Sequence, residues 1–212
     1  MKSRDIIKII DKKIKEKYSN PDSILKRYDE FLAINDIYRV YNPMTFRKNL
    51  KGHFELCDGI IELYHQAKIR LEKESLLRDL LAIGYDKDEL VKMILEVFNT
   101  QDNKEDMWEY GDILYCMKKY KYMPQYLEII KNKEYGTSRQ MVVLLVGKSK
   151  KPEVIPVLKE LLEDADVYGH ALEALTNFEG EDIKAIMQQY STHKMTWVRN
   201  TAKKYLKKRE IK

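Results

Sequence analysis

Cysteine, glycine and proline are scarce, with two, eight and five among the 212 residues. Cys57 and Cys116 lie far apart and form no Cys-x-x-Cys pair, so their spacing does not predict a disulfide framework. We expect both to be buried free thiols. Since 44% of the residues are hydrophobic, 34% are charged and helix breakers are few, the composition predicts a helix-rich globular protein.

Long hydrophobic runs are absent. The longest, at residues 141–146, is far shorter than the roughly 18 residues that a membrane-spanning helix needs. The first 18 residues interleave isoleucine with lysine and aspartate, so they lack the apolar core of a signal peptide. We therefore expect a cytoplasmic protein with no membrane partner.

Basic and acidic residues nearly balance, at 39 and 34. The basic excess is local, because residues 194–212 hold eight basic groups and one acidic group. Net charge alone therefore does not predict a nucleic-acid partner. The terminal cluster, which includes Lys204, Lys207 and Lys208, is nevertheless a candidate contact surface for nucleic acid.

A nine-residue pattern recurs four times in the second half of the chain. The copies are EYGDILYCM from Glu109, SRQMVVLLV from Ser138, VYGHALEAL from Val167 and VRNTAKKYL from Val198, at spacings of 29, 29 and 31 residues. Each copy predicts the start of a helix, and a second apolar helix follows each of the first three. Self-similarity at this period is typical of stacked helical units.

One face of these first helices can be compared position by position. The fifth and ninth positions share a helical face and are apolar in every copy. The sixth position is Leu114, Val143 or Leu172 in the first three copies, but Lys203 in the last. The loss of this stripe fits a terminal unit, because no further unit covers that face.

The first half of the chain is less regular. We interpret residues 1–72 as an N-terminal helical cap and 73–212 as repeats, atypical at 75–98 and regular at 107–208, within one continuous domain. The local signals predict helix starts at Ser3, Asn20-Pro21, Asn42-Pro43 and Asp86, a helix end at Gly84, and a long helix over 53–72.

A first helix of the VRNTA type, from Val198, followed by a second of the KKPEVIPVLKELLED type, from Lys150, resembles the HEAT repeat. The likeness is to the short bacterial form, also seen in phycobilisome-lyase-like repeats, and covers 107–208 well and 75–98 loosely. It implies an all-α, right-handed solenoid of antiparallel helix pairs with the N-terminal cap packed on it. It also implies a surface for a macromolecular partner, most often a protein.

Trp108 and Asp112 are four residues apart at the start of the first regular repeat. The pair resembles the Trp-x-x-x-Asp of HEAT-like alkylpurine DNA glycosylases, in which the tryptophan contacts the damaged nucleotide and the aspartate stabilises the developing sugar cation. The alternative is that Trp108 packs in the groove between units and Asp112 faces solvent. No second convincing aromatic clamp is found, although Trp197 opens the last repeat.

The second helices offer a candidate binding row. With Leu127, Leu158 and Ile186 taken as equivalent core positions, the neighbouring row is mixed in polarity. Its candidate contact residues are Tyr126, Ile129, Val157, Glu160 and Gln188. A shallow groove anchored by Tyr126 would suit a helix or an extended peptide of another protein, although curvature of the solenoid could equally cover it.

The loops that join first to second helices form a partly basic edge. Lysines at 118–121 and 148–151 are followed by the acidic residues Glu179, Glu181 and Asp182 in the next unit. A phosphate backbone favours a continuous basic track, because affinity accumulates with each phosphate neutralised. The interruption favours lysines that simply keep the loops solvated.

Signals for catalysis or metal binding are weak. His53, Cys57 and His65 share helical spacing, but structural zinc usually needs four ligands and no second cluster follows. No glycine-rich phosphate loop, HExxH or serine-hydrolase motif is present. We predict a non-enzymatic binding protein without cofactor or metal. The alternatives are a nucleic-acid-binding or glycosylase-like protein, and a toxin-neutralising or phage-related binding protein.

Overall fold

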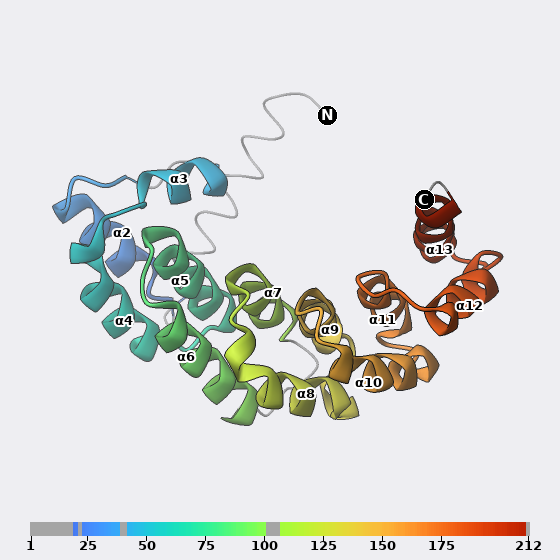
Figure 1. Cartoon of the computed structure of the whole chain (residues 1–212). Coiled ribbons are helices and arrows are strands. Elements are labelled where there is room, and N and C mark those ends of the chain that lie inside the picture. Colours follow the sequence, from blue (N-terminus) through green and yellow to red (C-terminus); the bar gives the residue numbers. More distant parts are fainter. Residues whose placement is uncertain (1–18, 21–22, 39–41, 101–106, 211–212) are drawn as a thin grey trace. The chain divides into compact units, whose positions relative to one another are not determined.

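The computed structural model describes residues 19–20, 23–38, 42–100 and 107–210. These residues form α-helices, short 3-10 segments and loops, with no strand among them (Figure 1). The all-helical prediction is therefore confirmed for the described part of the chain. The predicted helix start at Ser3 lies outside it, as does Pro21.

The chain divides into two compact units, Met1–Leu90 and Val91–Lys212. The division predicted between residues 72 and 73 instead falls inside a helix. Unit 1 contains α2 (Leu25–Ile34), α3 (Pro43–Asn49), η1 (Phe54–Leu56), α4 (Cys57–Gln66), α5 (Arg70–Ile83) and the start of α6 (Lys87–Thr100).

Helix α5 is the centre of unit 1, because α3 and α4 both pack against it while α2 packs on α4. Its Asp79 carboxylate is almost fully buried and accepts hydrogen bonds from Tyr28 Oη of α2 at 2.9 Å and Arg47 Nε of α3 at 3.0 Å. A buried carboxylate needs such paired charge and hydrogen bonds to offset its lost hydration. Asp79 therefore joins three helices.

Local signals at three helix boundaries of this unit are confirmed. Asn42 Oδ1 accepts the Met44 amide at 2.9 Å and caps α3. Gly84 ends α5 in the left-handed region, at φ 104°, where a side chain would be strained. Asp86 Oδ1 accepts the Asp88 amide at 2.7 Å and opens α6.

One predicted helix is wrong in its extent, and α2 begins at Leu25. The long helix over 53–72 is broken, because Ala67 and Ile69 are extended, with ψ values of 129° and 122°. No glycine or proline marks this break. It follows from tertiary packing, since the turn lets α5 fold back against α4 and bury the apolar faces of both.

Unit 2 contains the rest of α6 and all later helices. They are α7 (Trp108–Met117), η3 (Tyr120–Tyr122), α8 (Met123–Lys131), η4 (Lys133–Arg139), α9 (Gln140–Lys148), η5 (Pro152–Val154), α10 (Ile155–Glu160), η6 (Leu161–Glu163), α11 (Tyr168–Leu175), α12 (Glu181–Tyr190) and α13 (Thr196–Glu210).

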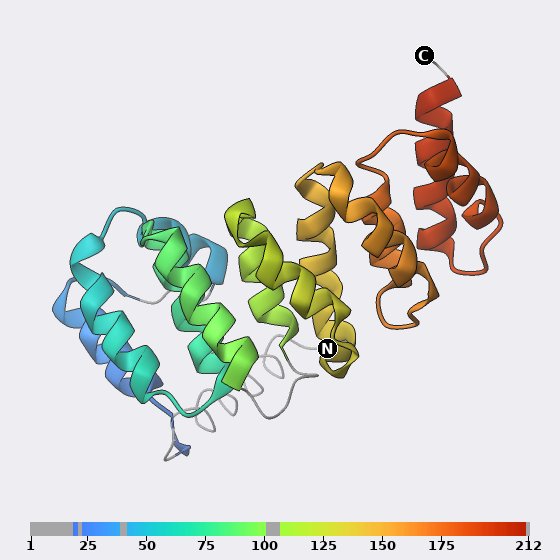
Figure 2. The ribbon, with the colours of Figure 1, turned by 60° about the horizontal axis from the view of Figure 1, so that its bottom comes forward.

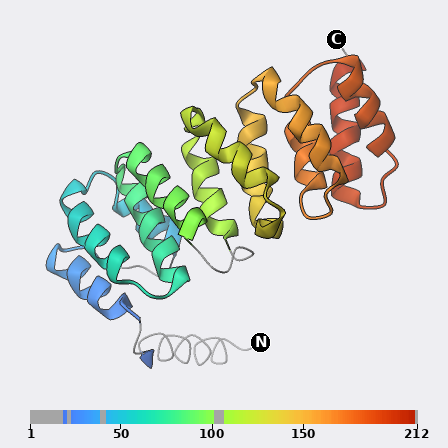
Figure 3. The same ribbon diagram turned by 90° about the horizontal axis from the view of Figure 1, so that it is seen from below.

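These helices lie in two rows that alternate along the chain. In one row, α7 packs on α9, α9 on α11 and α11 on α13 (Figure 1). In the other, α8 packs on α9, α10 on α11 and α12 on α13, so each second helix contacts the first helix that follows it. The alternation can be followed from yellow to red in Figure 2, and Figure 3 brings the second row forward.

The recurring nine-residue pattern maps onto the first row. Its fifth positions, Ile113, Val142, Ala171 and Ala202, are all buried. Its sixth positions are buried in the first three copies, whereas Lys203 in the last copy is exposed. The predicted end of the apolar stripe is thus confirmed, and it leaves α13 with one uncovered face in the described structure.

Two glycines allow the first-row helices to approach closely. A Cβ on Gly147 of α9 would lie 2.5 Å from Ala174 Cβ of α11. A Cβ on Gly169 of α11 would lie 2.2 Å from the Trp197 ring. Both distances are below any van der Waals contact, so these positions require glycine because of interhelical packing.

Arg139, the last residue of η4, is fully buried between two repeats. Its Nη1 and Nη2 donate to the two carboxylate oxygens of Asp164, at 2.9 and 3.2 Å. Nη1 also donates to the Ile130 carbonyl at 3.1 Å, and Nε donates to the Gly136 carbonyl at 2.9 Å. This planar, two-fold pairing joins the end of η4 to the loop before α11.

Candidate functional site at the α12–α13 end

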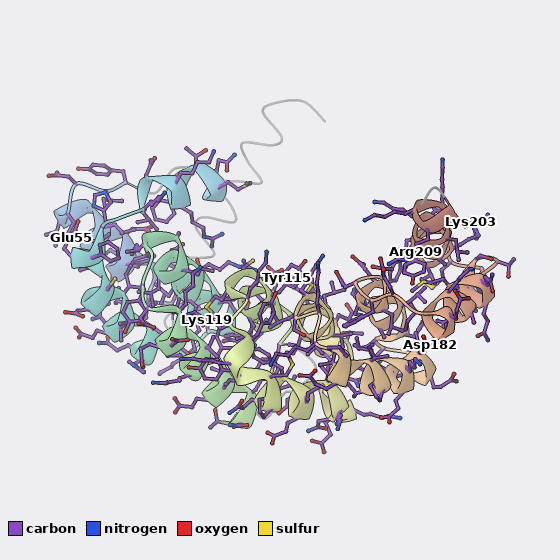
Figure 4. All side chains as sticks on the ribbon, in the orientation of Figure 1. Glu55, Tyr115, Lys119, Asp182, Lys203 and Arg209 are labelled. Carbon is purple, nitrogen blue, oxygen red and sulfur yellow. The ribbon has the colours of Figure 1, made fainter. Side chains whose placement is uncertain are left out.

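Helix α13 is amphipathic, with one face buried and the other lined by lysines. Its buried residues, Val198, Ala202 and Tyr205, recur every three or four positions and face the packed helices α11 and α12. The opposite face carries Lys203, Lys204, Lys207 and Lys208, all exposed. Lys203 is labelled in Figure 4. We call these four residues the lysine face.

A groove of about 540 Å³ lies beside this helix, between α12, α13 and the loop before α12. The predicted contact residue Gln188 lines it, together with the half-buried Leu206. At one end, the Arg209 guanidinium lies 3.6 Å from the centroid of the Tyr205 ring, and its Nη2 is 3.3 Å from Glu179 Oε1. Burial raises the pKa of Tyr205, although the charge of Arg209 opposes the shift.

The acidic residues that were predicted to interrupt the basic edge are present and exposed. The side chains of Glu179, Glu181 and Asp182 are 71%, 91% and 58% exposed. Each already has a cationic neighbour, since Arg209 pairs with Glu179, Lys184 with Glu181 and Lys159 with Asp182. Hydrogen bonding from Lys159 lowers the pKa of Asp182.

The lysine face differs from these acidic residues in its ion pairing. Within the described residues, no ion pair or hydrogen bond joins any of its four side chains to a carboxylate. Four uncompensated positive charges on one helical face generate a local positive potential. The predicted candidates Lys204, Lys207 and Lys208 are thus gathered on one accessible surface.

Three residues of the predicted contact row are instead part of the core. Tyr126, Ile129 and Val157 are 0%, 5% and 7% exposed, so they cannot meet a partner in this conformation. Of that row, only Glu160 and Gln188 are exposed. The alignment of the second helices placed Leu127 in the core, but at this helix it was shifted by one residue. A shift of one residue rotates the assigned face of a helix by about 100°.

The glycosylase-like pair is not assembled with an aromatic clamp in the described residues. Trp108 is 42% exposed at the first residue of α7, and Asp112 is half-buried one turn later. The expectation that Trp108 fills the groove between repeats is therefore wrong. Trp197, at the start of α13, does lie over α11, with its ring 5.5 Å from that of His170.

The proposed metal-ligand residues are not gathered. No group of three His, Cys, Asp or Glu side chains suited to a metal ion occurs in the described part of the chain. His53 Nδ1 instead contacts Glu55 Oε1 at 2.7 Å. Cys57 is buried as expected, and burial raises the pKa of its thiol, but Cys116 is exposed on α7, contrary to expectation. Neither cysteine forms a disulfide.

A second cleft, of about 600 Å³, was not anticipated from the sequence. It lies between η6, the start of α11, the end of α12 and the loop before α13. Tyr168, Tyr190 and His193 line it with Glu163 and Lys194. The tyrosines belong to different helices and come together only in the fold, although the Tyr190-x-x-His193 spacing was a visible clue.

None of the described helices is long and apolar enough to cross a membrane. No protein-family model matches the chain, no curated protein resembles it significantly, and no solved structure does so either. The functional argument therefore depends on the geometry of the described residues.

Proposed function

We propose that this chain is a non-enzymatic protein of HEAT-like repeats that binds a protein partner. The four recurring helix starts and the two alternating rows of unit 2 support a right-handed solenoid of antiparallel helix pairs. In such arrays, the apolar faces of the helices are buried between neighbouring repeats, and the remaining faces can contact other molecules.

The proposed contact surface is the lysine face of α13, and the proposed ligand is an acidic segment of the partner. The observation that carries this proposal is the set of four exposed lysines with no carboxylate partner among the described residues. Lys203 and Lys207, like Lys204 and Lys208, are one helical turn apart, so each pair can meet acidic groups on a short segment.

A protein fits this surface better than nucleic acid. A nucleic-acid backbone requires a track of positive charge, since each neutralised phosphate adds to the affinity. Here the exposed Glu179, Glu181 and Asp182 lie immediately before and within α12 and already pair with Arg209, Lys184 and Lys159, so this segment adds no unpaired positive charge to such a track. A short acidic peptide can bind the lysines without crossing these carboxylates.

The proposal can be tested with a fluorescein-labelled, glutamate-rich helical peptide and a labelled duplex oligonucleotide. Each would be titrated into the full chain at several salt concentrations. Replacing Lys204, Lys207 and Lys208 together by glutamate should weaken peptide binding about tenfold or more, because three surface pairs of about 0.2–1 kcal/mol each would become repulsive. Circular dichroism should be unchanged, since these side chains are exposed.

A matched control replaces Lys148, Lys150 and Lys151, which are exposed on the same unit but distant in sequence from α13, by glutamate. It changes the net charge by the same amount and should leave peptide affinity nearly unchanged. Equal losses for the two triple variants would reject a local site. Tighter binding of the oligonucleotide than of the peptide, with a steep salt dependence, would favour a nucleic-acid partner instead.

A further inference from the structure

The cleft formed by Tyr168, Tyr190 and His193 has the chemistry of a site for a cation. The His193 ring lies 5.7 Å from the Tyr190 ring, at an interplanar angle of 25°, and 5.5 Å from the Tyr168 ring. The three rings therefore form one continuous aromatic wall. Aromatic faces carry partial negative charge and attract guanidinium or ammonium groups.

The tyrosine hydroxyl oxygens of this wall can accept hydrogen bonds. Tyr168 Oη contacts Met195 Sδ at 2.6 Å, and Tyr190 Oη contacts the Leu162 carbonyl oxygen at 3.4 Å. A thioether and a carbonyl can only accept, so each hydroxyl donates in these contacts and its oxygen keeps lone pairs for a ligand. These two oxygens lie in a cleft that the exposed Glu163 carboxylate also lines. His193 Nδ1 already accepts the Met195 amide at 3.1 Å.

The charge of Glu163 acts on this wall. Burial raises the pKa of Tyr190, and the neighbouring Glu163 carboxylate raises it further. Within the described residues, Glu163 forms no ion pair or hydrogen bond. Lys194 lines the cleft as a cationic group with an exposed side chain, and the Arg199 guanidinium donates to the His193 and Lys194 carbonyl oxygens at 2.7 and 3.2 Å.

The same unit already holds an arginine in such surroundings. Between α12 and α13, the Arg209 guanidinium lies 3.6 Å from the Tyr205 ring centroid, and its Nη2 is 3.3 Å from Glu179 Oε1. Nη2 also donates to the Phe178 carbonyl at 3.2 Å, so a tyrosine face, a glutamate and a backbone carbonyl together surround this guanidinium. The second cleft offers tyrosine faces and a glutamate, and no arginine lines it.

We propose that the cleft lined by Glu163, Tyr168, Tyr190 and His193 receives the guanidinium group of an arginine side chain from a protein partner. The planar group stacks on a tyrosine ring while its N-H groups donate to the Glu163 carboxylate and the tyrosine hydroxyl oxygens. This site rests on the proposed function only in assuming a protein partner, because it is separate from the lysine face and selects the opposite charge.

The test uses the full chain and a blocked tripeptide, acetyl-Gly-Arg-Gly-amide, with binding followed by amide chemical shifts in two-dimensional NMR. The matched ligands replace arginine by norleucine or by glutamate. We expect saturable shifts around residues 162–168 and 189–194 with the arginine peptide, and at least tenfold weaker binding of the other two. Charged hydrogen bonds have strengths of the order that this ratio requires.

Two substitutions at the cleft should have opposite effects. Glu163→Gln should weaken arginine-peptide binding about tenfold, whereas Lys194→Gln should strengthen it about twofold by removing a repelling charge. Glu173→Gln is the matched control, because Glu173 is an exposed carboxylate of the same unit that does not line the cleft. It should leave the affinity unchanged.

Three results would overturn the inference. They are equal binding of the norleucine peptide, an arginine affinity insensitive to Glu163→Gln, and preferential binding of the glutamate peptide that Lys194→Gln abolishes. The lysine-face variant, with Lys204, Lys207 and Lys208 replaced, should bind the arginine peptide normally. A negative binding result at one site therefore does not change the conclusion about the other site.

Discussion

The buried pair of Arg139 and Asp164 gives a sharp test of how the repeats of unit 2 are held together. Asp164→Asn keeps the size of the side chain and its oxygen acceptor, but it removes the charge and turns an amide donor toward the guanidinium. Arg139, which is fully buried, would keep the remaining amide oxygen at position 164, two backbone carbonyls and the exposed carboxylate of Asp166, 3.5 Å away. Leaving a buried charge without its partner costs about 3–5 kcal/mol of the free energy of unfolding.

The lower end of that range applies here, because Asp166 still offers partial compensation. We therefore expect a loss of about 3 kcal/mol, which lowers the urea midpoint by about 1–2 M for an ordinary denaturant slope. Both tryptophans, Trp108 and Trp197, lie in unit 2, so their fluorescence reports on this unit. Asp166→Asn is the control and should cost less than about 1 kcal/mol, since that carboxylate is 46% exposed.

The effect of Asp164→Asn should also depend on pH. Burial alone would raise the pKa of Asp164, but hydrogen bonds from Arg139 and the Asp166 amide, with the charge of Arg139, outweigh it and lower the pKa. The folded protein then binds fewer protons than the unfolded chain. The stabilisation is complete above the unfolded pKa of about 3.9 and is lost as the pH falls through the lower folded value. A loss below about 1 kcal/mol at pH 7, or a loss that persists undiminished at pH 2, would refute the reasoning.

Three further predictions concern packing, capping and thiol reactivity. Gly147→Ala should lower the stability of unit 2 by about 1–3 kcal/mol in urea unfolding, because the new Cβ would lie 2.5 Å from Ala174 Cβ; an increase would show that the helices can separate freely. Asn42→Ala should lower the stability of unit 1 by about 0.5–2 kcal/mol in thermal or urea unfolding, because α3 loses its cap; no change would mean that this helix end is not limiting. A thiol reagent at pH 8 should label Cys116 rapidly and Cys57 slowly in the folded protein, because burial restricts access to Cys57 and raises its thiol pKa; equal rates, or a fast phase that survives Cys116→Ser, would contradict this.

The first-row helices of unit 2 could be predicted because their signal is local and periodic. The fifth positions of the four copies, including Ala171 and Ala202, are apolar in the sequence and buried in the structure. Asn42 and Gly84 likewise act through bonds or dihedral angles within a few residues of themselves. Such features require no knowledge of distant parts of the chain.

The features that could not be predicted depend on residues far away in sequence. The break at Ala67 has no local breaker and follows from the packing of α5 on α4. Arg139 would be placed on the surface by its polarity, and its burial is explained only by Asp164, 25 residues later. The prediction that Tyr126 contacts a partner was wrong, because Tyr126 is buried. Short helices allow a one-residue error in alignment, and such an error can assign a buried position to an exposed face.

The lysine face was accessible to prediction, whereas the aromatic cleft was not. Lysines clustered in one segment of sequence remain clustered on one helix, so Lys204, Lys207 and Lys208 could be named in advance. Tyr168 and Tyr190 are 22 positions apart and become neighbours only when α11 and α12 are folded around the same loop. Sites assembled from several helices therefore need coordinates before they can be recognised.

The hydrogen bonds between successive helix pairs of unit 2 have a mechanical consequence. The Met107 amide donates to Ser138 Oγ across 31 residues, and Tyr205 Oη donates to the Phe178 carbonyl across 27. Each of these bonds joins neighbouring helix pairs. Such a unit can therefore assemble by adding pairs in succession, with a low contact order that favours rapid folding. When force is applied to its two ends, the unit should unfold in a series of small steps, one helix pair at a time.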